Sequence, residues 1–142
     1  MNARLNRLQI ERLLPQKGSM CLIDAVLELT TDGITCTADA AREGNPLRDN
    51  HGVSVVHSIE YGAQAAALHR LTIDQERGKV SSGLLLQARD VSFIAEYLDR
   101  FSQPLLVSAR CAMASSETAR YVYEIRAGEV LASRGELTLR LM

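Results

Sequence analysis

The sequence predicts an α+β domain in which a curved antiparallel sheet wraps around one central helix. The middle of residues 54–73 consists almost entirely of glycine and alanine within a helix-like stretch, so this helix cannot fill a core with its own side chains. Most other apolar residues alternate with polar ones, as in strands with one buried face. Such a sheet needs cover on its apolar face, and the small-residue helix is the long helix available to provide it.

The composition is that of a single globular domain spanning residues 1–142. The net charge of −1 and the aromatic content of 4% give no basis for binding nucleic acid. No segment reaches the roughly 18 apolar residues of a membrane span, and the first residues are too polar for a signal peptide. The three cysteines have no metal-ligand spacing, so we expect reduced thiols, no metal site and a cytoplasmic location.

The N-terminal part is expected to contain a short helix and a hairpin. Leucines recur at helical spacing in residues 4–14, which predicts an amphipathic helix. Residues 19–30 alternate and predict a strand, and a Thr-Asp-Gly turn at 31–33 leads into a second strand at 34–40. These two strands are therefore expected to pair with each other.

The central part is a long polar loop followed by the small-residue helix. Residues 42–53 contain two glycines and a proline, and loops of this length in compact domains are often functional. Glu60 lies in the first turn of the helix, and Gln64 follows one turn later on the same face. A carboxylate at the positive end of a tightly wrapped helix is a candidate functional group.

The C-terminal part is expected to be sheet. Alternation predicts strands over residues 83–94, 104–114, 119–127 and 129–141. The last three are joined by short connections and should be antiparallel neighbours.

Two segments carry a resemblance to a known family. LLPQKGSMCLIDAV (13–26) and IEYGAQAAAL (59–68) resemble the opening and the E-x-x-A-Q helix of the hot-dog-fold 3-hydroxyacyl-[acyl-carrier-protein] dehydratases. The family's Gly-His-Phe-Pro loop is replaced by NHGV (50–53), and its His-Arg pair by QK (16–17). The chain therefore resembles a divergent branch, of the kind expected to serve polyene-type acyl chains.

The resemblance implies a hot-dog fold and a lyase activity in fatty-acid or polyene-type biosynthesis. Family members remove water from a 3-hydroxyacyl thioester on acyl carrier protein and form a trans-2-enoyl thioester, without a cofactor. A helix carboxylate and a loop histidine from different subunits of a dimer share the acid–base work. By position these residues are Glu60 and His51, and Gln64, His57 and Gly52 are expected to contact substrate.

Alternatives remain open at this level. His57 lies nearer the helix start than His51 and is a second candidate for the histidine, whereas His69 is expected to be structural. The same fold also supports acyl thioesterases, in which Glu60 would activate water. Because His51 lacks the following Phe-Pro, the chain is also a candidate for a non-catalytic acyl-binding subunit. The expected partners are acyl carrier protein and either a second copy or another hot-dog subunit.

Overall fold

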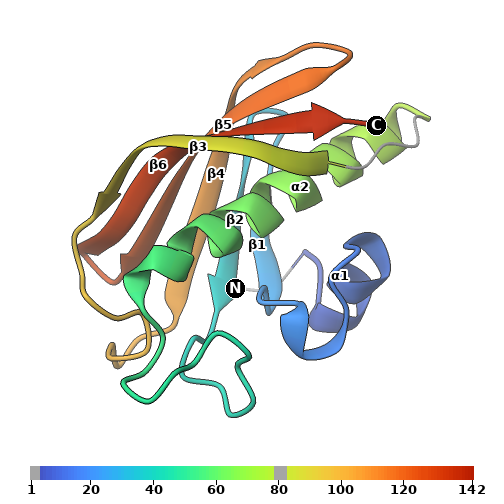
Figure 1. The fold of residues 1–142 in the computed structure, drawn as a ribbon. Helices are drawn as coiled ribbons and strands as arrows, with labels where there is room; N and C mark the ends of the chain where they lie inside the picture. The colour runs from blue at the N-terminus through green and yellow to red at the C-terminus, as the bar shows by residue number, and fades with distance from the viewer. Residues whose placement is uncertain (1–3, 79–82) are drawn as a thin grey trace.

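The computed structural model describes residues 4–78 and 83–142 (Figure 1). The elements in these ranges are α1 (Arg7–Leu13), η1 (Gly18–Met20), β1 (Ala25–Leu29), β2 (Gly33–Ala38), η2 (Val55–His57), α2 (Ser58–Glu76), β3 (Gly83–Phe93), β4 (Leu105–Ala114), β5 (Thr118–Ala127) and β6 (Val130–Leu141). Within the described residues, no helix combines the length and apolar character needed to cross a membrane.

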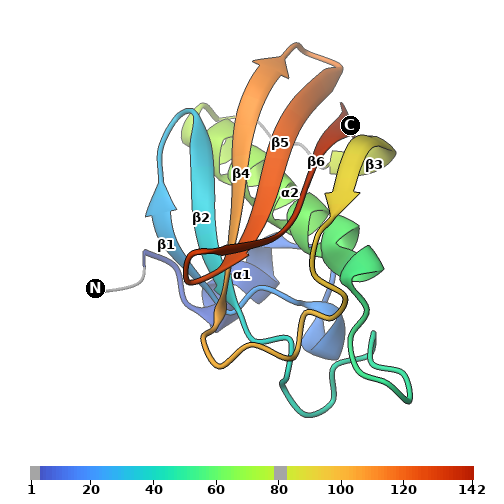
Figure 2. The ribbon, with the colours of Figure 1, turned by 90° about the vertical axis from the view of Figure 1, so that its left-hand side faces the viewer.

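The strands form one antiparallel sheet in the order β1-β2-β4-β5-β6-β3. Figures 1 and 2 show this sheet curving around α2, which lies along its concave face. The predicted hairpin of β1 and β2 and the predicted neighbourhood of β4, β5 and β6 are both confirmed. The sequence did not predict that β3 pairs with β6, because β4 and β5 lie between these two strands in the chain.

The small residues of α2 bring the helix backbone close to the sheet. A Cβ atom at Gly62 would lie only 2.6 Å from Cγ of Tyr123, so a larger residue would not fit there without displacement. Large side chains from the sheet supply the core volume instead, among them Tyr121, Tyr123, Ile125 and Leu137. The side chains of α2 can therefore be small, because side chains from the surrounding strands fill the interior.

The N-terminal helix adds a second cover that the sequence did not assign to it. The structure has α1 at Arg7–Leu13, with Asn6 and Gln9 forming a capping box at its start. Ile10 and Leu14 are buried in the main core, and α1 lies near α2. The sheet's apolar face is therefore covered mainly by α2, with α1 beside it.

The predicted strand over residues 19–30 is too long. Only Ala25–Leu29 is a strand, and Gly18–Met20 forms a 3-10 turn. Cys21, Leu22 and Ile23 are buried consecutively, so their burial does not follow the alternation of a strand. The carbonyl groups of this segment are bound by side chains instead of a neighbouring strand, since Arg7 donates to the carbonyls of Gly18 and Cys21.

Candidate functional site

Glu60 and Gln64 are brought together on α2. Glu60 is half-buried in the first turn, and Gln64 is only 1% exposed. Gln64 Nε2 donates hydrogen bonds to Glu60 Oε1 at 3.1 Å and to the carbonyl oxygen of Met20 at 2.8 Å. Gln64 Oε1 accepts a hydrogen bond from the amide of Leu22 at 2.9 Å.

These partners determine which way the Gln64 amide faces. If its oxygen and nitrogen were exchanged, two donors would face each other at the Leu22 N–H and two acceptors at the Met20 carbonyl. Neither pair could form a hydrogen bond. One N–H of Gln64 therefore remains for Glu60 and holds one carboxylate oxygen in place. The two side chains, which share one face of the helix, are therefore joined by a hydrogen bond.

His51 lies on an exposed turn before the helix. Asp49 and Gly52 close this turn, with the Asp49 amide donating to the Gly52 carbonyl at 2.9 Å, and the His51 amide donates to Asp49 Oδ1 at 2.8 Å. Gly52 has φ +127°, and a Cβ atom on it would lie 2.8 Å from Asp99 Oδ1. Glycine is thus required here by the backbone and by the approach of Asp99.

The segment after β3 holds this turn from the other side. The Leu98 amide donates to the Val53 carbonyl at 2.8 Å, and the Val53 amide donates to Asp99 Oδ1 at 3.0 Å. Arg100 Nη2 donates to the His51 carbonyl at 2.8 Å. Figures 1 and 2 show the two loops at the same end of the molecule.

Sequence reasoning missed this support for the loop. The carboxylate of Asp99 also pairs with Arg48 at 3.1 Å, so one acid connects two segments of the loop region. The partners are about fifty residues apart in the chain, and no local spacing links them. Arg48 and Arg100 therefore help to shape the turn that carries His51.

The loop is also tied to α2 beside Glu60. Asn45 Nδ2 donates to the hydroxyl of Tyr61 at 3.1 Å and to the carbonyl of Ala40 at 2.9 Å. Burial raises the pKa of Tyr61, which keeps the phenol neutral. This contact fixes the loop against the helix one residue after the candidate carboxylate.

The two candidate histidines have different settings. His57 is the N-cap residue of α2, half-buried, one turn before Glu60 on the same face. His51 is exposed, and in the part of the chain that the structure describes no hydrogen bond or ion pair joins it to Glu60. Within one subunit the proposed acid–base pair is therefore not connected.

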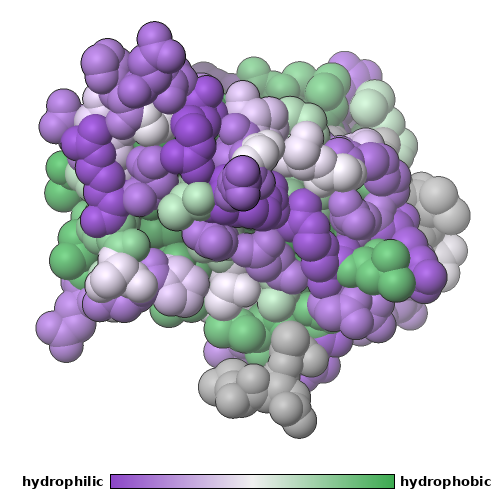
Figure 3. Space-filling view, turned by 90° about the horizontal axis from the view of Figure 1, so that it is seen from below, coloured by the Kyte–Doolittle hydropathy of each residue, from purple (hydrophilic) through white to green (hydrophobic). Residues whose placement is uncertain are grey.

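Apolar surface borders the site. Met20, whose carbonyl binds Gln64, is 39% exposed, and Val56, just before α2, is 50% exposed. Seen from this end of the molecule, the surface is mostly hydrophilic with separate hydrophobic patches (Figure 3). Exposed apolar side chains next to a candidate site are suited to contact with substrate or with another subunit.

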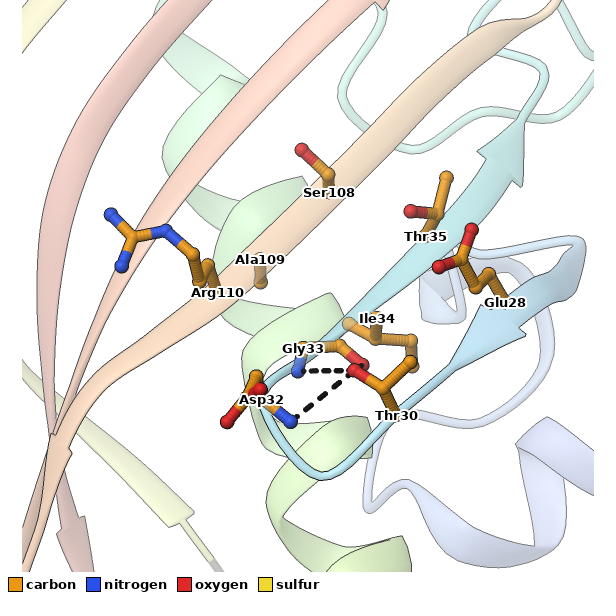
Figure 4. Close-up of a pocket in the computed structure, with 9 residues that line it drawn as sticks. All are labelled: Glu28, Thr30, Asp32, Gly33, Ile34, Thr35, Ser108, Ala109 and Arg110. Atoms are coloured by element: carbon orange, nitrogen blue, oxygen red, sulfur yellow. Dashed lines mark hydrogen bonds between the residues drawn. The ribbon is translucent and has the colours of Figure 1, made fainter.

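A pocket of about 220 Å³ lies elsewhere, at the turn between β1 and β2 and along β4 (Figure 4). It is lined by Glu28, Thr30, Asp32, Gly33, Ile34, Thr35, Ser108, Ala109 and Arg110, and the amides of Asp32 and Gly33 donate to Thr30 Oγ1. None of the predicted site residues lines it. In residues 4–78 and 83–142, no group of three or more His, Cys, Asp or Glu side chains is arranged to hold a metal ion.

Comparison with known proteins gives a family and a fold. The model of the ApeP-like family, described as ApeP dehydratase, matches residues 8–140. A chain of the dehydratase heterocomplex ApeI:P from Xenorhabdus doucetiae is similar in structure, with a TM-score of 0.83 and 21% identity over 94% of this chain and 90% of that chain. No curated protein sequence gave a significant match.

Structures described as thioesterases are also similar. A mutant of thioesterase PA1618 from Pseudomonas aeruginosa has a TM-score of 0.71 and 10% identity, over 98% of this chain and 95% of that chain. A hypothetical thioesterase with coenzyme A from Streptococcus pneumoniae has a TM-score of 0.63 and 13% identity, over 82% of this chain and 84% of that chain. At these identities the likenesses show the fold alone, and they confirm the predicted hot-dog fold.

Proposed function

Because the family model covers residues 8–140, the chain belongs to the ApeP-like dehydratase family, and we propose that it removes water from 3-hydroxyacyl-[acyl-carrier-protein] thioesters. The product is a trans-2-enoyl thioester. The observation that carries this proposal is the half-buried Glu60 at the start of the central helix, oriented by the amide of Gln64 at 3.1 Å.

The chemistry needs a base for C2 and an acid for the hydroxyl group. In the proposed mechanism His51 takes the C2 proton, since a ring nitrogen of neutral imidazole can act as a general base. The C2 electron pair forms the C2–C3 double bond as the C3–O bond breaks. The Glu60 carboxyl gives a proton to the departing oxygen, directly or through a water molecule, so that it leaves as water. Gln64, His57 and Gly52 are proposed to border the bound thioester.

The proposal places the two reacting side chains on different subunits. Among the residues that the structure describes, no hydrogen bond or ion pair joins His51 to Glu60, and apolar side chains next to the site are exposed. A second hot-dog subunit would cover that surface and bring a histidine to Glu60. The similar structure described as a dehydratase heterocomplex supports a hot-dog partner subunit, which is either a second copy or a different chain.

Two other functions are kept as alternatives. The exposed position of His51 favours a non-catalytic acyl-binding subunit, which would show turnover only with a second hot-dog protein. Hydrolysis, in which Glu60 would activate water, is the other alternative, since structures described as thioesterases share this fold. Released thiol would indicate hydrolysis, whereas enoyl absorbance would indicate dehydration.

The variant Glu60→Gln tests the proposal directly. We expect the rate of dehydration of a 3-hydroxyacyl carrier-protein thioester to fall by about 10²–10⁴-fold, the usual contribution of a general acid or base. The rate is measured from the absorbance of the enoyl product. The variant should keep the circular dichroism spectrum of the wild type.

Glu76→Gln, an exposed carboxylate near the other end of α2, is the matched control and should keep full activity. The assay is run with the chain alone and with a hot-dog partner. Undiminished dehydration by the Glu60 variant in the active preparation would contradict the proposed role.

A further inference from the structure

Asp24 is the centre of a charged cluster on the segment that precedes β1. Arg7 Nη1 donates to Asp24 Oδ1 at 2.9 Å, and Arg42 Nη1 donates to the same oxygen at 3.3 Å. The amide of Asp39 donates to Asp24 Oδ2 at 2.8 Å. The backbone amide of Asp24 donates to the carbonyl of Thr37, so the acid is itself fixed against the end of β2.

Both guanidinium groups extend from Asp24 to the backbone of the turn at residues 18–21. Arg7 Nη2 donates to the carbonyls of Gly18 at 3.0 Å and Cys21 at 2.7 Å. Arg42 Nη2 donates to the carbonyls of Ser19 and Cys21, each at 3.3 Å. Two cations thus meet at one carbonyl, and Asp24 supplies the negative charge that lets them lie side by side.

The same turn presents its other polar groups to Gln64. The Met20 carbonyl and the Leu22 amide, on either side of Cys21, are the groups that fix the Gln64 amide. The arginines therefore hold the carbonyls of Gly18, Ser19 and Cys21 from one side, and Gln64 holds its two groups from the other. A continuous series of hydrogen bonds runs from Asp24 through the arginines and the turn to Gln64 and Glu60.

We infer that Asp24 is a positioning residue for Glu60. With Arg7 and Arg42 it keeps residues 18–22 in the one conformation in which Gln64 has an N–H left for the carboxylate. The inference rests on the proposed function, in which Glu60 contacts the substrate. Because the Asp24 side chain is 31% exposed, its contribution lies in geometry more than in the energy of an isolated ion pair.

Asp24→Asn tests the inference because it removes the charge and keeps the shape. In the preparation that shows turnover, we expect kcat to fall by about 10-fold or more, since small displacements of a reacting group are costly, while KM stays within about twofold. Glu136→Gln is the matched control, because it removes a carboxylate on β6 that pairs with Arg89 of β3 at 3.3 Å. This variant should leave kcat unchanged.

A double-mutant cycle shows whether Asp24 acts through Gln64. Gln64→Ala already releases Glu60, so adding Asp24→Asn to it should lower kcat no further. A purely structural role would give additive losses in the double variant, and that result would overturn the inference. An unchanged kcat in Asp24→Asn, while Glu60→Gln is inactive, would also overturn it.

Hydrogen exchange provides a readout that does not depend on the reaction. The Leu22 amide is bonded to Gln64 Oε1, and its exchange should become faster in Asp24→Asn but not in Glu136→Gln. If Glu60→Gln kept full activity, the proposed function would fail on its own. In that case the exchange rate of the Leu22 amide would still test whether Asp24 fixes the turn. An unchanged exchange rate in Asp24→Asn would overturn the inference.

Discussion

His69 is a buried histidine with a partner on each ring nitrogen. Nε2 lies 2.9 Å from the carbonyl oxygen of Thr30, and Nδ1 lies 2.6 Å from the hydroxyl of Tyr121. A carbonyl only accepts, so Nε2 carries the hydrogen, and in the neutral ring Nδ1 accepts from the tyrosine. Burial lowers the pKa of His69, and burial also raises the pKa of Tyr121. These bonds agree with the structural role expected for His69 and distinguish it from His51 and His57.

The lowered pKa of His69 predicts a pH dependence of stability. Below pH of about 6.5 the unfolded chain binds a proton on this residue that the folded chain does not. The contribution of His69 to the free energy of unfolding should therefore be fully present above that pH. As the pH is lowered from there toward the folded pKa, the free energy of unfolding should decrease by up to about 1.4 kcal/mol per pH unit. Urea titrations between pH 7.5 and 5.5 measure this slope.

His69→Gln should remove the His69 part of the slope, although the variant is less stable at every pH. Gln75→Ala, which changes an exposed side chain without a titratable group, is the control and should keep the wild-type slope. Equal slopes in the wild type and the His69 variant would contradict the assignment of a buried neutral ring.

At the scale of elements, Tyr123 determines how closely α2 approaches the sheet. Its ring lies between two glycines, since Cβ atoms at Gly62 and Gly135 would come within 2.6 Å and 2.9 Å of ring carbons. Its hydroxyl is 3.0 Å from Ser133 Oγ. The glycine in the middle of α2 therefore serves packing, at a cost in helix propensity of about 1 kcal/mol relative to alanine.

Gly62→Ala should consequently destabilise the protein despite the better helix propensity of alanine. Overpacking typically costs about 1–3 kcal/mol, and we expect a net loss in the free energy of unfolding measured by urea denaturation. Gln75→Ala, at an exposed position of the same helix, has no such clash and should change stability by less than about 0.5 kcal/mol. A smaller loss from Gly62→Ala in a Tyr123→Leu background would support the clash, and a more stable Gly62→Ala protein would refute it.

At the scale of the whole molecule, β3 is an edge strand with exposed apolar side chains. It is last in the sheet order, and Leu84, Leu86, Phe93 and Ile94, on β3 or just after it, are all exposed. An uncovered edge of this kind pairs readily with another strand. Because the proposed site needs a second subunit, this edge is where we expect the two sheets to join.

Leu86→Lys should therefore weaken association. We expect the dissociation constant of the dimer, or of the complex with another hot-dog subunit, to rise by about tenfold or more, measured by analytical ultracentrifugation. Val130→Lys is the matched control, since Val130 is 51% exposed and Leu86 53%, but Val130 lies at the turn between β5 and β6. Unaltered association of the Leu86 variant would place the interface elsewhere.

The sequence by itself determined the features that neighbouring residues specify. Alternation gave the strands after the central helix nearly to the residue, and the small residues of 54–73 identified the helix that the sheet surrounds. The pair Glu60 and Gln64 was also visible, because residues four apart share a face of a helix. The strand expected at 19–30 was wrong in its first part, since the partners of that turn are side chains from other segments.

Only the tertiary structure decided which distant segments meet. The pairing of β3 with β6, the bond from Arg100 to the turn of His51 and the hold of Asp24 on the partners of Gln64 all join residues that no periodicity relates. Periodicity records which face of an element is buried, but it does not say which other element covers that face. Those contacts depend on how the whole chain packs, and they orient the carboxylate that the sequence could only locate.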